Sequence, residues 1–96
     1  MRPYSINVDD IDSVPYFLWN EGTTLAEFRQ ILADHLQPDR PLYVARLLRE
    51  GRVEDVWKFL KPEEVAQSWD DVAQHLGHRR EFWRFLLSVW RRHGVL

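Results

Sequence analysis

Cysteine is absent from this chain of 96 residues, and long apolar runs are absent as well. Without cysteine, the chain has no disulfide framework, no thiolate zinc site and no thiol catalysis. No stretch approaches the roughly 18 or more apolar residues of a membrane-spanning helix. The first ten residues, MRPYSINVDD, lack the charged-then-apolar order of a secretory signal. We therefore expect a protein of the cytoplasm that makes no membrane contact.

Motifs for catalysis or ligand binding are also missing. The four glycines lie far apart, so the sequence offers no glycine-rich phosphate loop. The serines lack the neighbours of a nucleophile elbow or of a Ser-x-x-Lys site. His75 and His78 have a spacing that some metal sites use, but no third ligand stands at a recognisable spacing from them. The sequence predicts a protein that is not an enzyme and that uses no cofactor or metal.

The composition is that of a globular protein, with 45% hydrophobic and 29% charged residues. A chain of this length makes one small domain. The net charge is only −2, but its distribution is uneven. Residues 1–28 carry five acidic residues against one arginine, whereas residues 79–92 carry five arginines against one glutamate. We expect an acidic, extended N-terminal arm over residues 1–14 and a single helical domain over residues 15–96.

Two helices are predicted in the first half of this domain from capping residues and from the spacing of apolar residues. Thr24 and Glu27 have the spacing of a capping box, which starts a helix. Apolar residues then recur at three- and four-residue steps up to Pro38, and they predict a buried face made of Leu25, Phe28, Leu32 and Leu36. A second, antiparallel helix is predicted to begin near Asp39 and to end at Gly51.

The second half continues with shorter helical segments. Residues 53–60 place their apolar side chains on one face of a helix. A new helix is then predicted to begin with Pro62 as its first residue. That segment runs to Gly77 as one helix or as two short ones, and a final helix covers about His78 to His93. No stretch outside the arm alternates with a period of two. The predicted fold is therefore all-α, a compact bundle of five or six helices.

The final helix is predicted to organise the bundle. At about 100° per residue its apolar positions span an arc of roughly 200°, wider than one core-facing stripe, and they are Phe82, Trp83, Phe85, Leu86, Leu87, Val89 and Trp90. We expect Phe82 and Leu86 to lie in the core. Arginine and tryptophan dominate the energetics of many protein interfaces. The predicted contacts for a partner are Arg80, Trp83, Arg84, Leu87 and Arg91 on this helix, with Asp9, Asp10 and Asp12 in the arm.

The chain resembles a known family in the apolar residues of several short segments, which are 15–19, 47–50, 55–60, 62–65 and 75–83. Over roughly residues 14–93 the chain resembles small bacterial proteins that tend to be encoded beside nucleotidyltransferase toxins of the abortive-infection (AbiEii-like) type. The resemblance implies an antitoxin-like protein that binds and restrains such a toxin. It offers no catalytic residues to transfer to this chain.

Two alternatives stay open at this point. The first is a small DNA- or RNA-binding regulator that uses Arg80, Arg84 and Arg91 to meet phosphates. A recognition helix needs a polar, groove-facing side near its start, however, and Phe82 and Trp83 occupy that part of the helix. The second alternative is a self-associating structural protein.

Overall fold

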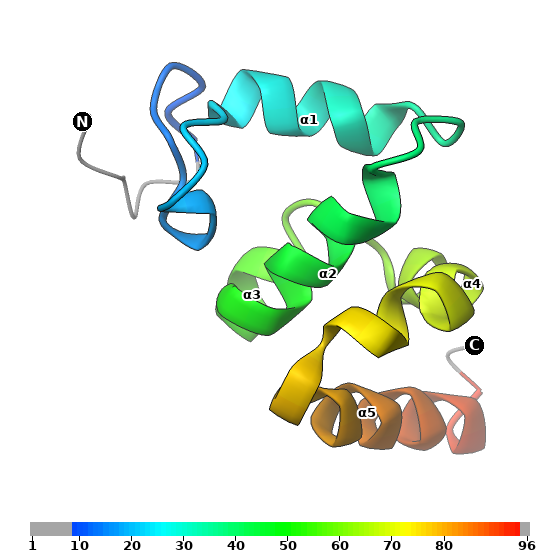
Figure 1. Cartoon of the computed structure of the whole chain (residues 1–96). Helices are drawn as coiled ribbons and strands as arrows, with labels where there is room; N and C mark the ends of the chain where they lie inside the picture. The colour runs from blue at the N-terminus through cyan, green and yellow to red at the C-terminus, as the bar shows by residue number, and fades with distance from the viewer. Residues whose placement is uncertain (1–8, 95–96) are drawn as a thin grey trace.

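The computed structural model describes residues 9–94, and this part of the chain is helical without a β-strand (Figure 1). Its five α-helices, given in chain order, are α1 (Leu25–Ala33), α2 (Arg40–Glu50), α3 (Val53–Val56), α4 (Pro62–Val72) and α5 (Arg80–Arg92). Three short 3-10 turns accompany them, η1 (Tyr16–Leu18), η2 (Ala73–His75) and η3 (Gly77–Arg79). The prediction of an all-α bundle is confirmed. Residues 1–8 of the predicted arm lie outside the described part of the chain.

The start of α1 follows the predicted capping box. The backbone N–H of Glu27 donates to the Thr24 hydroxyl at 3.3 Å, and the Glu27 carboxylate accepts from the Thr24 N–H at 3.1 Å. The end of α1 comes earlier than predicted, at Ala33, because the Asp34 carboxylate accepts from the N–H of Leu36 at 3.0 Å and closes a local turn instead. The prediction that Leu36 belongs to the buried face is therefore wrong, since its side chain is 91% exposed in the loop.

The helix α2 runs through the middle of the molecule and packs against α1, α3, α4 and η1, so α2 and not the final helix organises the bundle. It begins after Asp39 with proline in its first turn and ends at Gly51, as predicted. At one end of the core, Phe17 and Phe28 meet edge to face at 5.1 Å, and Phe59 joins both rings at 5.8 and 5.4 Å. These three rings fix η1 and α1 against the segment that follows α3.

Residues 11–14 are tied to the start of α1. The N–H of Leu25 donates to the carbonyl of Ser13 at 2.9 Å, and the N–H of Ala26 donates to the carbonyl of Ile11 at 3.0 Å. Val14 is 5% exposed and belongs to the hydrophobic core.

The predicted start of a helix at Pro62 is confirmed, because α4 begins there and the Glu64 carboxylate accepts from the N–H of Lys61 at 3.0 Å.

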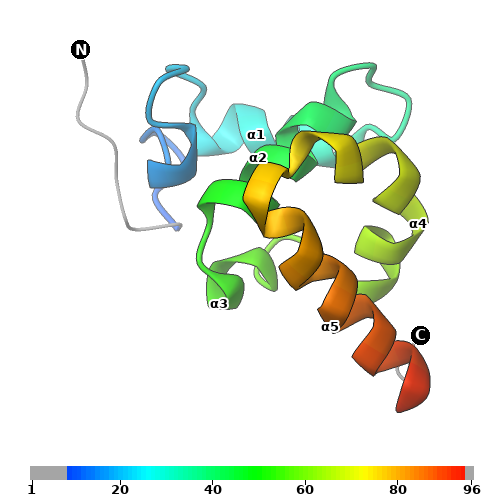
Figure 2. The ribbon, with the colours of Figure 1, turned by 60° about the horizontal axis from the view of Figure 1, so that its bottom comes forward.

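The helix α5 follows two 3-10 turns, in which Gly77 adopts the left-handed backbone region at φ +56°. It forms the lower side of the molecule in Figure 1 and lies toward the viewer in Figure 2. With 13 residues it is the longest helix between residues 9 and 94, and no helix in that range has the length and apolar character needed to cross a membrane.

Candidate functional site

One side of α5 is held in the core by Trp83 and Leu87, which are 0% and 2% exposed. The indole N–H of Trp83 donates to the carbonyl of Leu48 at 2.8 Å. This carbonyl lies in the last turn of α2, where backbone acceptors lack a partner within their own helix. Trp57 packs edge to face against both Trp83 and Trp90, with ring centroids 5.8 and 5.1 Å apart. Trp83 therefore attaches α5 to α2 by packing and by a hydrogen bond.

Another side of α5 carries a strip of apolar side chains, which we call the outer strip and which consists of Phe82, Phe85, Leu86 and Val89. Leu86 lies at its inner edge and still packs against the core. The three- and four-residue spacing of these residues places them along one line of the helix. Phe85 is 59% exposed and Phe82 is 40% exposed, while Leu86 and Val89 are half-buried. Contiguous exposed apolar surface on a helix is a common mark of a binding site for another protein.

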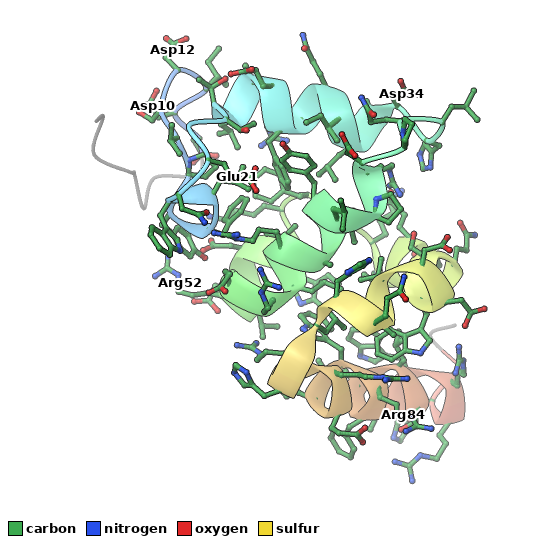
Figure 3. The ribbon with its side chains drawn as sticks, in the orientation of Figure 1. Asp10, Asp12, Glu21, Asp34, Arg52 and Arg84 are labelled. Atoms are coloured by element: carbon green, nitrogen blue, oxygen red, sulfur yellow. The ribbon has the colours of Figure 1, made fainter. Side chains whose placement is uncertain are left out.

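The charged residues of α5 lie on more than one side of the helix. The guanidinium of Arg79 lies 5.1 Å from the centre of the Phe82 ring, and Arg84 forms an exposed ion pair with Glu81 at 3.6 Å. Figure 3 shows Arg84 on the lower side of the molecule, along α5. Arg80 and Arg91 are exposed and form no ion pair with any residue between 9 and 94. At about 100° per residue, Arg80, Arg84 and Arg91 fall together on the side of α5 away from the outer strip.

The two faces of α5 are assigned differently from the sequence-based expectation. Trp83 and Leu87, which we expected to contact a partner, are buried and offer it no surface in this structure. Phe82, which we expected in the core, is 40% exposed, whereas Leu86, which we also expected there, is half-buried and packs against the core. The physical reason is the Leu48 carbonyl, because the indole of Trp83 satisfies this buried acceptor while it fills the core. Burying Trp83 rotates Phe82 and Phe85 outward.

The three predicted aspartates lie far from α5. Figure 3 places Asp10 and Asp12 at the upper edge of the molecule, opposite Arg84. The Asp10 carboxylate closes a turn by accepting from the hydroxyl of Ser13 at 2.6 Å and from the N–H of Asp12 at 3.2 Å. The structure therefore does not bring the aspartates and the arginines together into one site within a single chain.

A buried carboxylate that the sequence did not single out lies at Asp55, whose side chain is 2% exposed. The hydroxyl of Tyr16 donates to it at 2.6 Å, the Nε of Arg52 donates at 3.0 Å, and the Nζ of Lys58 lies 3.6 Å away. Burial by itself raises the pKa of Asp55, but the hydrogen bonds from Tyr16 and Arg52 and the nearby positive charges outweigh it and hold the pKa below its ordinary value. Burial of the Tyr16 hydroxyl raises the pKa of Tyr16, and the hydrogen bond to Asp55 raises it further. The hydrogen bond that the Tyr16 oxygen accepts from the Arg52 N–H acts in the opposite direction but is outweighed.

The Asp55 cluster fastens elements that are far apart in the sequence. Tyr16 belongs to η1, and Asp55 lies 39 residues later in α3. The hydroxyl of Tyr16 also accepts from the N–H of Arg52 at 2.7 Å, just before α3 begins. The cluster therefore has a structural role, and no sequence motif marks it because its members meet only in the folded chain.

The remaining polar hollows carry no comparable grouping. A hollow of about 430 Å³ between the α1–α2 loop and α4 is lined by His35, Gln67, Ser68, Asp71 and the buried Arg40, among others. Arg40 is engaged elsewhere, because its Nε donates to the Leu32 carbonyl at 2.9 Å and its Nη2 lies 3.6 Å from Glu64. Within residues 9–94, no three histidine, aspartate or glutamate side chains gather closely enough to hold a metal ion.

Comparisons with protein-family models, with curated proteins and with solved structures found no match to this chain. The family resemblance described above therefore stays a prediction. The most distinctive surface in the described part of the chain is the outer strip of α5.

Proposed function

We propose that this protein is a non-enzymatic binding module that docks on a partner protein through the outer strip of α5. The observation that carries the proposal is the exposure of Phe85 and Phe82 on a helix whose other side is anchored by Trp83. Covering apolar area contributes about 25 cal/mol per Å². Two phenylalanines that are already held on a helix can therefore supply a substantial part of a binding free energy with little loss of backbone entropy.

The charges beside the strip are of both signs. Arg79 lies against the Phe82 ring, and at about 100° per residue Glu81 and Arg92 fall beside Phe85. Arg80, Arg84 and Arg91 fall on the far side of α5 from the strip. Aromatic residues are frequent at the energetic centre of interfaces. The proposed partner surface is accordingly apolar where it covers the two phenylalanines.

We further propose that the partner is a nucleotidyltransferase-type toxin and that binding restrains it, in the manner of an antitoxin. The support is the resemblance over roughly residues 14–93, which includes the whole outer strip. In this role the protein binds its partner and catalyses no reaction. The cytoplasm fits both the absence of cysteine and the proposed partner.

The proposal is tested by co-expression with the product of the neighbouring gene, followed by co-purification through a tag on one protein. Phe85→Glu places a charge at the centre of the strip and should abolish co-purification. The matched control is Leu42→Glu, which changes another exposed apolar residue, 49% exposed and in the first turn of α2. We expect Leu42→Glu to behave as wild type. Separate elution of the two wild-type proteins at micromolar concentration would contradict the proposal.

A nucleic-acid-binding role remains the second candidate, because Arg80, Arg84 and Arg91 share one flank of α5. The net charge of −2 gives no general attraction to phosphates. A mobility-shift assay at low salt separates the two functions. Binding that is lost in the triple alanine variant of these arginines and kept in Phe85→Glu favours nucleic acid, and the absence of any shift disposes of this alternative.

A further inference from the structure

Two charges of opposite sign lie on the same flank of the outer strip, one near each end of α5. Glu81, Phe85 and Arg92 have a spacing that places them on one line of the helix, with the phenylalanine between the charges. The Glu81 side chain is 77% exposed, so its carboxylate can accept a further partner besides Arg84. Arg92 is exposed and forms no ion pair with any residue between 9 and 94.

This order of charges is complementary to its own copy. The helix α5 lies at the lower edge of the molecule in Figure 1 and toward the viewer in Figure 2, and no other described element lies beyond it. When two copies of a helix pack antiparallel about a two-fold axis, each flank of the contact meets the same flank of the copy. Glu81 of each copy then lies opposite Arg92 of the other.

One axis can serve both the charges and the apolar residues. The midpoint between positions 81 and 92 and the midpoint of the strip, positions 82 to 89, are one residue apart. One residue corresponds to only about 1.5 Å along a helix, which a long arginine side chain can span. The register that stacks the two strips therefore also pairs the opposite charges.

The remaining charges of α5 do not oppose this arrangement. On the other flank of the strip, Arg79 would come near His93 of the copy. With an ordinary pKa of about 6.5, histidine is uncharged at pH 8, so no like charges meet there at that pH. Arg80, Arg84 and Arg91 lie away from the strip and stay in solvent.

We propose that a second copy of the protein binds the outer strip, with the two α5 helices antiparallel and Glu81 of each copy paired with Arg92 of the other. The inference rests on the proposed function only in that both use the outer strip. Phe85 and Phe82 are 59% and 40% exposed, and together they offer on the order of 200 Å². A stable interface needs about 800 Å² per partner. The dimer is therefore weak, and a partner protein on the strip would dissociate it.

The first test is the weight-average mass, measured by sedimentation equilibrium at pH 8 from micromolar to millimolar concentration. The wild-type mass should rise with concentration from the monomer value of 11.6 kDa toward twice that value. It should rise no further, because a two-fold contact uses the same surface on both copies and closes. Phe85→Glu should stay monomeric, and the control Leu42→Glu should follow the wild-type curve.

The second test exchanges the charges. Glu81→Arg or Arg92→Glu alone places like charges opposite each other at both ends of the contact and should weaken the dimer by about tenfold. An equimolar mixture of the two variants should dimerise at least as well as wild type, because every opposite pair is then restored. The matched control is Arg91→Glu, the same change of charge one residue away on the far side of α5, which should leave the dimer unchanged.

Four results would overturn the inference, and none of them depends on the partner. Wild type that stays monomeric at millimolar concentration excludes the dimer, and a mass well above that of a dimer indicates an open contact between unlike surfaces. Dimerisation of Phe85→Glu places the contact elsewhere. A mixture of the charge variants that associates no better than either variant alone excludes the antiparallel pairing.

The proposed function fails or stands separately. Wild type that is monomeric but co-purifies with the product of the neighbouring gene overturns the dimer alone. Wild type that dimerises as described but does not co-purify overturns the proposed function alone.

Discussion

Truncation of Trp83 is expected to be the most damaging single change on α5, far more so than truncation of Phe85. Trp83 is fully buried, contacts Trp57 and donates to the Leu48 carbonyl. Replacing a buried aromatic residue by alanine costs about 3 to 5 kcal/mol. Small proteins are stabilised by only about 5 to 15 kcal/mol, so Trp83→Ala should remove a large fraction of the total.

A second variant distinguishes the contributions that packing and the hydrogen bond of Trp83 make to the free energy of unfolding. Trp83→Phe keeps much of the apolar volume but leaves the Leu48 carbonyl buried without its donor, at a cost of about 1 to 3 kcal/mol. Phe85→Ala removes a side chain that is 59% exposed, and its effect should stay within about 0.5 kcal/mol.

The assay is urea denaturation followed by far-ultraviolet circular dichroism, which does not depend on tryptophan fluorescence. The urea midpoint should be highest for Phe85→Ala, lower for Trp83→Phe and lowest for Trp83→Ala, while the denaturant slopes stay similar. Equal destabilisation by Phe85→Ala and Trp83→Ala would refute the assignment of the two faces of α5.

Two further predictions concern other parts of the fold. Because folding lowers the pKa of Asp55 below its ordinary value of 3.8, the stabilisation by this carboxylate is complete above that value and is lost as the pH falls through the lower folded pKa. Thermal melts between pH 2 and 7 should show this acid-side loss in wild type and a weaker one in Asp55→Asn. Gly51→Ala should destabilise the protein by about 1 to 3 kcal/mol, measured by urea denaturation, because a Cβ there would lie 2.6 Å from the Leu47 carbonyl oxygen.

Local signals in the sequence were sufficient to predict most helix boundaries. The start of α1 follows from the side-chain contacts between Thr24 and Glu27, and the start of α4 follows from the fixed backbone of Pro62. Both signals act within one turn, so they are readable from neighbouring residues. The early end of α1 was missed because the turn made by Asp34 competes with apolar periodicity that continues to Leu36.

Contacts between distant residues could not be predicted in this way. The apolar arc of α5 was correctly recognised as too wide for the core, but periodicity does not say which part of it turns inward. That choice depends on the Leu48 carbonyl, 35 residues before Trp83. The bond between Tyr16 and Asp55 spans 39 residues and likewise leaves no trace in local spacing.

The most direct test of the central claim is the dissociation constant of the complex with the product of the neighbouring gene, measured by calorimetric titration. If the outer strip of α5 is the docking surface, Phe85→Glu should weaken binding by a factor of about ten or more, since each factor of ten corresponds to about 1.4 kcal/mol. The control Leu42→Glu should bind as wild type does. Equal affinity of Phe85→Glu and wild type would contradict the claim.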